Sequence, residues 1–225
     1  INPETTIGID VGIKSFVVTS DGRLFEPNRH LKNNLQRLRV LQQRASRKKK
    51  GSTNRKKANK CVAILHEKIS NSRLDYIHQM TTRLIHDNQV ESIVIEDLNV
   101  SGLLLNHKLA QAISDVSWGK FFEVLQYKCD WYGKNLIKIG RFDPSSKRCS
   151  HCGTIYKELT LQERQWTCGN CHTVHDRDVN AASSVKWFGQ EQIKQTGAGC
   201  SDGSVELRRL RRAKKQKNKE IPINL

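Results

Sequence analysis

Residues 6–27, TIGIDVGIKSFVVTSDGRLFEP, contain the pattern that decides the expected fold. The first part, TIGIDV, alternates apolar residues with small or polar ones, which is the period of a strand with one buried face. The run SFVVT predicts a second strand, and the Asp21-Gly22 pair after it is a strong hairpin-turn signal leading into RLFEP. The stretch therefore predicts an antiparallel meander whose first strand ends beside an acid, Asp10.

A pair of helices is expected after the meander. A leucine stripe at three- and four-residue spacing predicts a helix over residues 31–41, and a second apolar stripe predicts a helix from Val62 to His86. Together they indicate a helical hairpin over residues 30–87. The basic stretch RKKKGSTNRKKANK, residues 47–60, would interrupt the helices and form the tip of the hairpin.

The rest of the chain alternates strand and helix patterns. Residues 91–98, ESIVIEDL, form an apolar run that ends in acid, which is typical of a buried parallel strand. Residues 109–132 predict one long helix, and residues 134–140, KNLIKIG, predict another strand. Residues 142–174 are rich in turn formers, and a last helix is expected to start at Asp178. The pattern as a whole predicts a mixed α/β fold.

The positive charge of the chain is concentrated in two segments. The sequence has 39 Lys and Arg against 22 Asp and Glu, a formal net charge of +17. Residues 29–60 hold 13 basic residues and no acid, and residues 207–219 hold 8 and no acid. Such blocks indicate binding to a polyanion, most often nucleic acid, although a solvated helix face or a solubilising tail gives the same pattern. The candidate contacts in the hairpin tip are Arg47, Lys48, Lys49, Lys50, Arg55, Lys56 and Lys57.

Nothing in the sequence points to a membrane. No apolar run approaches the roughly 20 residues of a membrane span, and no signal peptide is visible, so we expect an intracellular, cytoplasmic protein without a membrane partner. In that compartment the seven cysteines indicate metal binding or free thiols rather than disulfides.

Four of the cysteines have the spacing of a zinc site. They form two Cys-x-x-Cys pairs separated by 15 residues, Cys149 with Cys152 and Cys168 with Cys171. Four thiolates satisfy the tetrahedral preference of Zn²⁺ and leave no open position, so the site would be structural. The alternatives are a redox pair, or a ligand set that includes one of the nearby histidines. Those histidines are His151, His172 and His175.

Three acids lie at the ends of predicted elements. Asp10 lies at the end of the first strand, Glu96 ends a hydrophobic strand, and either Asp176 or Asp178 begins the last helix. Each could be a turn former, a strand-end acid or a helix cap when it is considered alone. Together they indicate a hard-oxygen site for Mg²⁺ or Mn²⁺, which can activate water and stabilise the leaving oxygen of a phosphodiester.

The order of these motifs resembles the TnpB (OrfB) family of transposon-encoded proteins, which are similar to the type V CRISPR nucleases. The resemblance covers roughly residues 5–190. It is carried by the D-x-G at the first strand, the two-helix insert, and the motifs IVIEDLNV, SWGKFFEVLQYKCDWYG, PSSKRCSHCG, WTCGNC and HDRDVNAA.

The resemblance implies a fold, an activity and site residues. The fold would be an RNase H-like (RuvC) nuclease core with an inserted four-cysteine zinc ribbon, and the activity would be Mg²⁺-dependent, RNA-guided cleavage of target DNA. The implied catalytic acids are Asp10, Glu96 and the second Asp of D-R-D, Asp178. The implied nucleic-acid contacts before the ribbon are Ser145, Ser146, Lys147 and Arg148.

The expected organisation follows from the same resemblance. The nuclease core would occupy residues 1–145 with the hairpin at 30–87, the zinc ribbon residues 146–174, and the last RuvC segment residues 175–195. A basic flexible tail is expected at residues 196–225.

The start of the sequence is a departure from the family pattern. Family members carry an N-terminal recognition portion, whereas this sequence begins at Ile1, almost at the first catalytic strand. We therefore expect a fragment or a truncated member. Two alternatives to guided cleavage stay open: an unguided, structure-specific nuclease, and a non-catalytic remnant that binds nucleic acid. The sequence predicts neither the guide RNA nor the oligomeric state.

Overall fold

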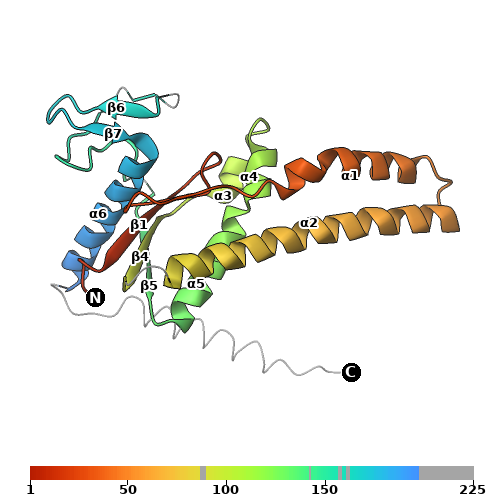
Figure 1. Cartoon of the computed structure of the whole chain (residues 1–225), viewed down its shortest axis with the longest axis horizontal. Helices are drawn as coiled ribbons and strands as arrows, with labels where there is room; N and C mark the ends of the chain where they lie inside the picture. Colours follow the sequence, from red (N-terminus) through yellow and green to blue (C-terminus); the bar gives the residue numbers. More distant parts are fainter. Residues whose placement is uncertain (87–89, 142, 157–158, 161–162, 198–225) are drawn as a thin grey trace, which may run out of the picture.

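The computed structural model describes residues 1–86, 90–141, 143–156, 159–160 and 163–197. The tail predicted at 196–225 lies, apart from its first two residues, outside the described residues. Figure 1 shows a central sheet with one long helix on one side and a group of helices on the other. None of the helices in the described ranges combines the length and apolar character that crossing a membrane would require.

The central sheet has five strands in the order β3-β2-β1-β4-β5. Strands β1, β2 and β3 pair antiparallel, as the meander predicts, and β1, β4 and β5 pair parallel. The predicted mixed α/β class is therefore confirmed. The strands are β1 (Thr6–Val11), β2 (Val17–Thr19), β3 (Leu24–Phe25), β4 (Ser92–Glu96) and β5 (Asn135–Ile139).

One face of the sheet forms the main hydrophobic core. Isoleucines at alternate positions of β1 and β4 pack against α2 (Thr53–His86) and α5 (Trp118–Trp131). Strand alternation sends Ile7 and Ile9 to this side, together with Ile93 and Ile95, and all four are nearly inaccessible to solvent. The period-two pattern thus determines which face of each strand is covered by these helices.

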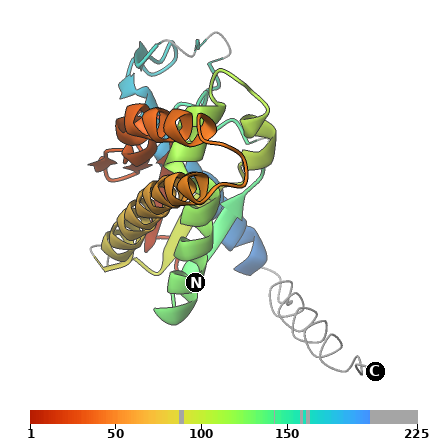
Figure 2. The same ribbon diagram turned by 90° about the vertical axis from the view of Figure 1, so that its right-hand side faces the viewer.

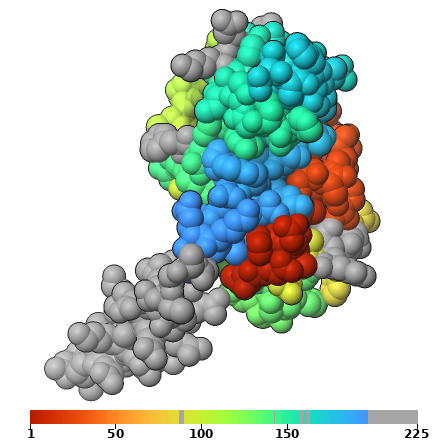
Figure 3. All heavy atoms as spheres, turned by 90° about the vertical axis from the view of Figure 1, so that its left-hand side faces the viewer, coloured from red at the N-terminus to blue at the C-terminus, as the bar shows by residue number. Residues whose placement is uncertain are grey.

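The opposite face is covered by α6 (Arg177–Gly197). Gly8 allows this helix to pack closely, because a Cβ atom at that position would lie 2.2 Å from the carbonyl oxygen of Ala182. Figure 3 shows α6 (blue) on the molecular face that lies away from the helical hairpin, with the N-terminal residues beside it. Gln190 Nε2 donates a hydrogen bond of 2.7 Å to the carbonyl of Pro3 and joins these two segments.

The helical hairpin consists of α1 (His30–Ser46) and α2. Figures 1 and 2 show the two helices side by side, extending away from the sheet. A small separate cluster of Leu38, Leu65 and Ile69 holds them together.

The basic stretch 47–60 is only partly a loop, which corrects the predicted interruption. The turn is short and α2 already begins at Thr53. Gly51 adopts a φ of +84°, and the Ser52 hydroxyl accepts a hydrogen bond from the Arg55 backbone N–H, as an N-cap residue does. Half of the basic stretch therefore lies on the first two turns of a helix.

The single helix predicted over residues 109–132 is wrong, because the structure has two helices there. The first, α4 (Ala110–Val116), ends at Ser117, whose φ of +59° is incompatible with a continuous helix. The Ser117 hydroxyl donates to the Ser114 carbonyl, and α5 starts at the next residue. A short helix, α3 (Val100–Leu104), precedes them and was not predicted; the Asn99 side chain caps it.

The cysteine-rich segment forms a small separate layer. Strands β6 (Gln165–Thr167) and β7 (Val174–Asp176) pair antiparallel and lead directly into α6. Trp166 and Leu159 pack around two of the cysteines as a minor core. Figure 3 shows this layer at one end of the molecule, above the start of α6.

Candidate catalytic edge and metal centre

Asp10 and Glu96 lie side by side at one edge of the central sheet. Strands β1 and β4 are parallel neighbours in which Ile9 pairs with Ile95, so the two acids follow at equivalent positions. Asp10 follows Gly8 by two residues, and Glu96 follows Val94 by two residues. Both Gly8 and Val94 contact α6. Because side chains alternate along a strand, both carboxylates belong to the face that α6 covers.

Asp178 reaches the same edge from the first turn of α6. The close contact between Gly8 and Ala182 fixes the position of the helix along β1. Asp178 precedes Ala182 by one helical turn, and Asp10 follows Gly8 on the same strand face, so the beginning of α6 lies over the end of β1. The structure thus brings the three acids named from the sequence to one edge.

The environment of Asp10 disfavours its charged form. Burial raises the pKa of Asp10 well above its ordinary value, because the charged form loses hydration. The negative charges of Glu96 and Asp178 raise this pKa further, while a hydrogen bond from the Val11 N–H and the charge of Arg177 lower it. An acid of this kind is stabilised in its ionised form by a bound cation.

Two polar partners hold the other acids in place. The Ser145 hydroxyl donates a hydrogen bond to Glu96 Oε1. Arg164, just before β6, donates from Nη1 to both carboxylate oxygens of Asp178, at 3.1 and 2.9 Å. Sequence reasoning missed Arg164, and no spacing or motif around this residue could have indicated its partner.

Asp176 has a different position from Asp178. Its Oδ1 atom accepts hydrogen bonds from the backbone N–H groups of Asp178 and Val179, at 3.0 and 3.1 Å. These are the contacts of a helix N-cap. The sequence left both acids of D-R-D as candidates for the hard-metal site, and the geometry gives Asp176 a capping role.

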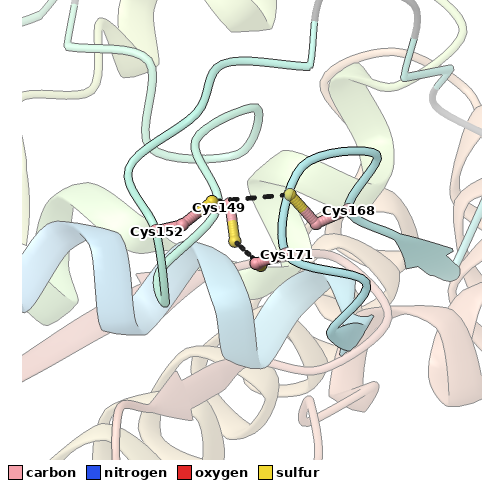
Figure 4. A group of neighbouring side chains, drawn as sticks. All are labelled: Cys149, Cys152, Cys168 and Cys171. Atoms are coloured by element: carbon pink, nitrogen blue, oxygen red, sulfur yellow. Dashed lines mark hydrogen bonds between the residues drawn. The ribbon is translucent and has the colours of Figure 1, made fainter.

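The four cysteines converge on one point. One ligand atom from each of Cys149, Cys152, Cys168 and Cys171 lies within 4.8 Å of the other three (Figure 4). Two of the Sγ–Sγ distances are 3.6 Å, close to the roughly 3.8 Å edge of a zinc–thiolate tetrahedron with 2.3 Å bonds. The cluster can therefore hold a metal ion such as Zn²⁺. Within the described ranges, no other group of three or more His, Cys, Asp or Glu side chains converges this tightly.

The two cysteine pairs have the same local geometry. Each pair is followed by a residue with positive φ, Gly153 at +80° and His172 at +56°. The N–H of that residue donates to the carbonyl of the first cysteine of its pair, at 2.9 Å in both turns. A threonine hydroxyl, from Thr154 or Thr173, lies 3.3 Å from the sulfur of the second cysteine. This repeated turn directs both sulfurs of each pair to the same side.

Of the three candidate histidines, His175 contacts the cluster. Its Nε2 atom lies 3.0 Å from Cys149 Sγ, and its ring lies beside Trp166 with the centroids 4.8 Å apart. Because the sulfurs of all four cysteines already surround one point, His175 is placed as a partner of a cysteine sulfur rather than as a fifth member of the cluster.

The predicted nucleic-acid contacts occupy two environments. In the hairpin tip, the side chain of Arg55 is half-buried and its Nη1 donates to the Lys48 carbonyl at 3.3 Å. The other six tip residues are exposed: Arg47, Lys48, Lys49, Lys50, Lys56 and Lys57.

The segment before the ribbon is attached to α6. The Arg148 guanidinium lies 3.8 Å from the centre of the Trp187 ring, and the Arg148 carbonyl accepts from Asn180 Nδ2 at 2.7 Å. Ser145 is buried, Ser146 is half-buried and Lys147 is exposed. The proposed contact role of Arg148 therefore coexists with a packing role.

Two protein-family models match the chain. Residues 1–107 match OrfB_IS605, described as a probable transposase, and residues 118–185 match the Cas12f1-like TNB domain. Among curated proteins, a putative RNA-guided DNA endonuclease of Streptomyces pristinaespiralis is 44% identical over 222 residues, covering 98% of this chain and 53% of that protein. The putative RNA-guided DNA endonuclease InsQ of Escherichia coli K12 is 32% identical over 196 residues, covering 80% of this chain and 48% of InsQ.

Solved structures with the same fold are also similar. A Cas12f1 chain from a complex with sgRNA and target DNA superposes with a TM-score of 0.61 at 18% identity, covering 83% of this chain and 50% of that chain. A chain of a CRISPR-Cas12f ternary complex gives 0.63 at 21% identity, covering 80% and 38%. The resemblance predicted from the motifs is confirmed. The chain spans about half the length of the curated relatives it matches.

Proposed function

Because this chain combines an OrfB_IS605 region with a Cas12f1-like TNB domain, we propose that it is the catalytic part of a metal-dependent DNA endonuclease of the RuvC type. One observation carries the proposal: Asp10, Glu96 and Asp178 lie at the same carboxyl edge of the central sheet, where burial and the charges of Glu96 and Asp178 raise the pKa of Asp10. Three acids at one edge of a strongly basic chain are suited to phosphodiester hydrolysis.

The sheet topology supports an RNase H-like core. Three antiparallel strands are followed by two strands parallel to the first, and α6 covers the face that bears the acids. In this arrangement the catalytic acids come from the first strand, from the parallel strand next to it and from the start of a helix.

The residues at the edge have the donors that Mg²⁺ or Mn²⁺ prefers. The carboxylates offer hard oxygen ligands, and the raised pKa of Asp10 indicates negative charge that a cation would compensate. When bound, a pair of such ions would activate water and stabilise the departing 3′ oxygen. Ser145 orients Glu96, and Arg164 holds Asp178 at the edge.

The cysteine cluster has a separate, structural role in the proposal. Four thiolates fill all the positions of a tetrahedral Zn²⁺ ion, so this site would stabilise the ribbon without taking part in the reaction. The ribbon in turn supplies Arg164, which joins the structural site to the catalytic edge.

In this proposal, the recognition of target DNA through a guide RNA is a property of a protein as long as the relatives. The relatives are named putative RNA-guided DNA endonucleases, and the chain spans about half of their length. We infer target DNA and a guide RNA as partners. The exposed hairpin tip and the segment 145–148 would contact the phosphate backbone of these nucleic acids. Sequence would be read by base pairing with the guide.

The proposal is tested by Mg²⁺-dependent cleavage of plasmid and branched DNA, with and without a cognate RNA. Asp178→Asn should abolish cleavage while DNA binding persists, and Asp176→Asn is the matched control, because an Asn side chain can still cap α6. Equal losses in both variants would contradict the assigned roles. Cutting without RNA favours an unguided nuclease, and binding without cutting at any Mg²⁺ concentration favours a non-catalytic remnant.

A further inference from the structure

A cavity lies where the loop after β1 meets α1 and α4. Its volume is about 450 Å³, within the range of roughly 300–1,000 Å³ that small-molecule sites occupy. Ile13, Leu35 and Val116 provide apolar lining. Because Ile13 follows β1 by two residues, the cavity lies at the same end of that strand as Asp10.

The rim of this cavity is strongly basic. Lys14, Arg29, Lys32 and Lys108 line it, and all four side chains are exposed. No ion pair within the described ranges neutralises any of them. The acid in the lining, Asp115, is already engaged: it forms an ion pair of 3.7 Å with Arg73, which does not line the cavity, and it accepts from the backbone N–H groups of Leu31 and Lys32 at 3.0 Å. The cavity therefore offers uncompensated positive charge.

The wall of the cavity contains a buried amide without a partner. Asn28 is only 8% exposed, and neither its Oδ1 nor its Nδ2 atom makes a hydrogen bond in the part of the chain that the structure describes. Buried polar groups are nearly always hydrogen-bonded, because leaving one unpaired destabilises the folded state. Asn28 thus holds an unused donor next to an unused acceptor, which matches the donor–acceptor pairs on the edge of a nucleobase. Both atoms are covered in this structure, so pairing with a base requires the side chain to rotate toward the cavity.

We propose that this cavity binds one nucleotide of a single-stranded nucleic acid. The basic rim holds the phosphate, the apolar lining contacts the face of the base, and Asn28 pairs with the base edge. The inference rests on the proposed function in that the chain acts on nucleic acid, but it requires neither catalysis nor a divalent ion. The nucleotide can come from the target DNA strand or from the guide RNA, since both offer the same chemistry.

The test measures binding of labelled single strands of about eight nucleotides to the full chain by fluorescence anisotropy. EDTA is present to prevent cleavage, and the salt concentration is varied because salt weakens every contact between a lysine and a phosphate, those of the rim included. Asn28→Leu keeps the size of the side chain and removes the unpaired amide. We expect this variant to bind about tenfold more weakly while its melting temperature rises. The measurement is made with a DNA strand and with an RNA strand. The strand whose affinity falls more in Asn28→Leu is the source of the bound nucleotide.

Variants of the exposed rim provide a second measurement that does not depend on a buried residue. Lys14→Gln and Lys32→Gln should each reduce the slope of log affinity against log salt by about one. Lys68→Gln, an exposed lysine of α2 outside the cavity, is the matched control and should change binding less. Unchanged affinity in Asn28→Leu, or rim variants that match Lys68→Gln, would overturn the site. The cleavage assay, which tests the proposed function, would be unaffected by that outcome.

Discussion

Arg164 in the ribbon donates two hydrogen bonds from a single guanidinium nitrogen to the carboxylate of Asp178, at 3.1 and 2.9 Å. The pair joins the residue before β6, the strand that leads into the second cysteine pair, to the first turn of α6. It places a positive charge next to one of three acids that face a common edge. In a partly exposed location such a pair contributes about 1 kcal/mol or less to stability, so its main effect is on the charge and position of the acid.

Removing that positive charge should strengthen divalent-ion binding. In Arg164→Gln, Asp178 keeps its carboxylate but loses its cationic partner, so the edge becomes more negative. We expect the apparent dissociation constant for Mn²⁺, measured by calorimetry, to fall about threefold to tenfold. Arg141→Gln removes a similar pair, with Asp97, and is the control. Weaker Mn²⁺ binding in Arg164→Gln would instead mean that the positioning of Asp178 by Arg164 outweighs the effect of its charge.

The raised pKa of Asp10 predicts a pH-dependent stability. In the unfolded chain this carboxyl ionises near pH 3.9, whereas in the folded chain it holds its proton to higher pH. The folded state therefore binds more protons above about pH 4, and stability falls as pH rises through the folded pKa. Asp10→Asn should raise the melting temperature at pH 7 in metal-free buffer, with little change near pH 3.5. Equal shifts at both pH values would contradict this explanation.

The parts of the molecule that depend on local pattern could be predicted from the sequence. The β1–β2 pairing follows from alternating residues and an Asp-Gly turn, and the cysteine site follows from spacing. The break at Ser117 could not be predicted, because the apolar stripe continues through it and serine is not a strong helix breaker. The partners of Asp178 and Asp115 come from distant segments, and no local pattern encodes such contacts.

The cysteine cluster predicts a zinc-dependent ribbon on a zinc-independent core. Cys171→Ser should lower the zinc content from about one ion per chain to nearly none, measured by elemental analysis. Fluorescence of Trp166, which packs beside two cysteines, should shift, while the far-ultraviolet circular dichroism of the helices persists. Cys61→Ser, an exposed thiol on α2, is the control. Full zinc retention in Cys171→Ser would exclude the four-thiolate site.

Gly8 sets the distance between β1 and α6, and that distance positions Asp178 over Asp10. A Cβ atom at residue 8 would lie 2.2 Å from the Ala182 carbonyl oxygen and 2.5 Å from the Lys186 nitrogen, and neither backbone atom can move without the helix. Gly8→Ala should therefore lower the free energy of unfolding by about 2–4 kcal/mol, measured by urea denaturation.

The variant should also lose cleavage beyond its loss of folded protein, because α6 carries Asp178 away from the edge of the sheet. Gly119→Ala in α5 is the matched control, since a Cβ atom there meets nothing within 4 Å and alanine favours the helix by up to about 1 kcal/mol. Restoring the folded fraction of Gly8→Ala at low temperature separates the two effects. Full activity of the refolded variant would show that Asp178 does not need the close contact between β1 and α6.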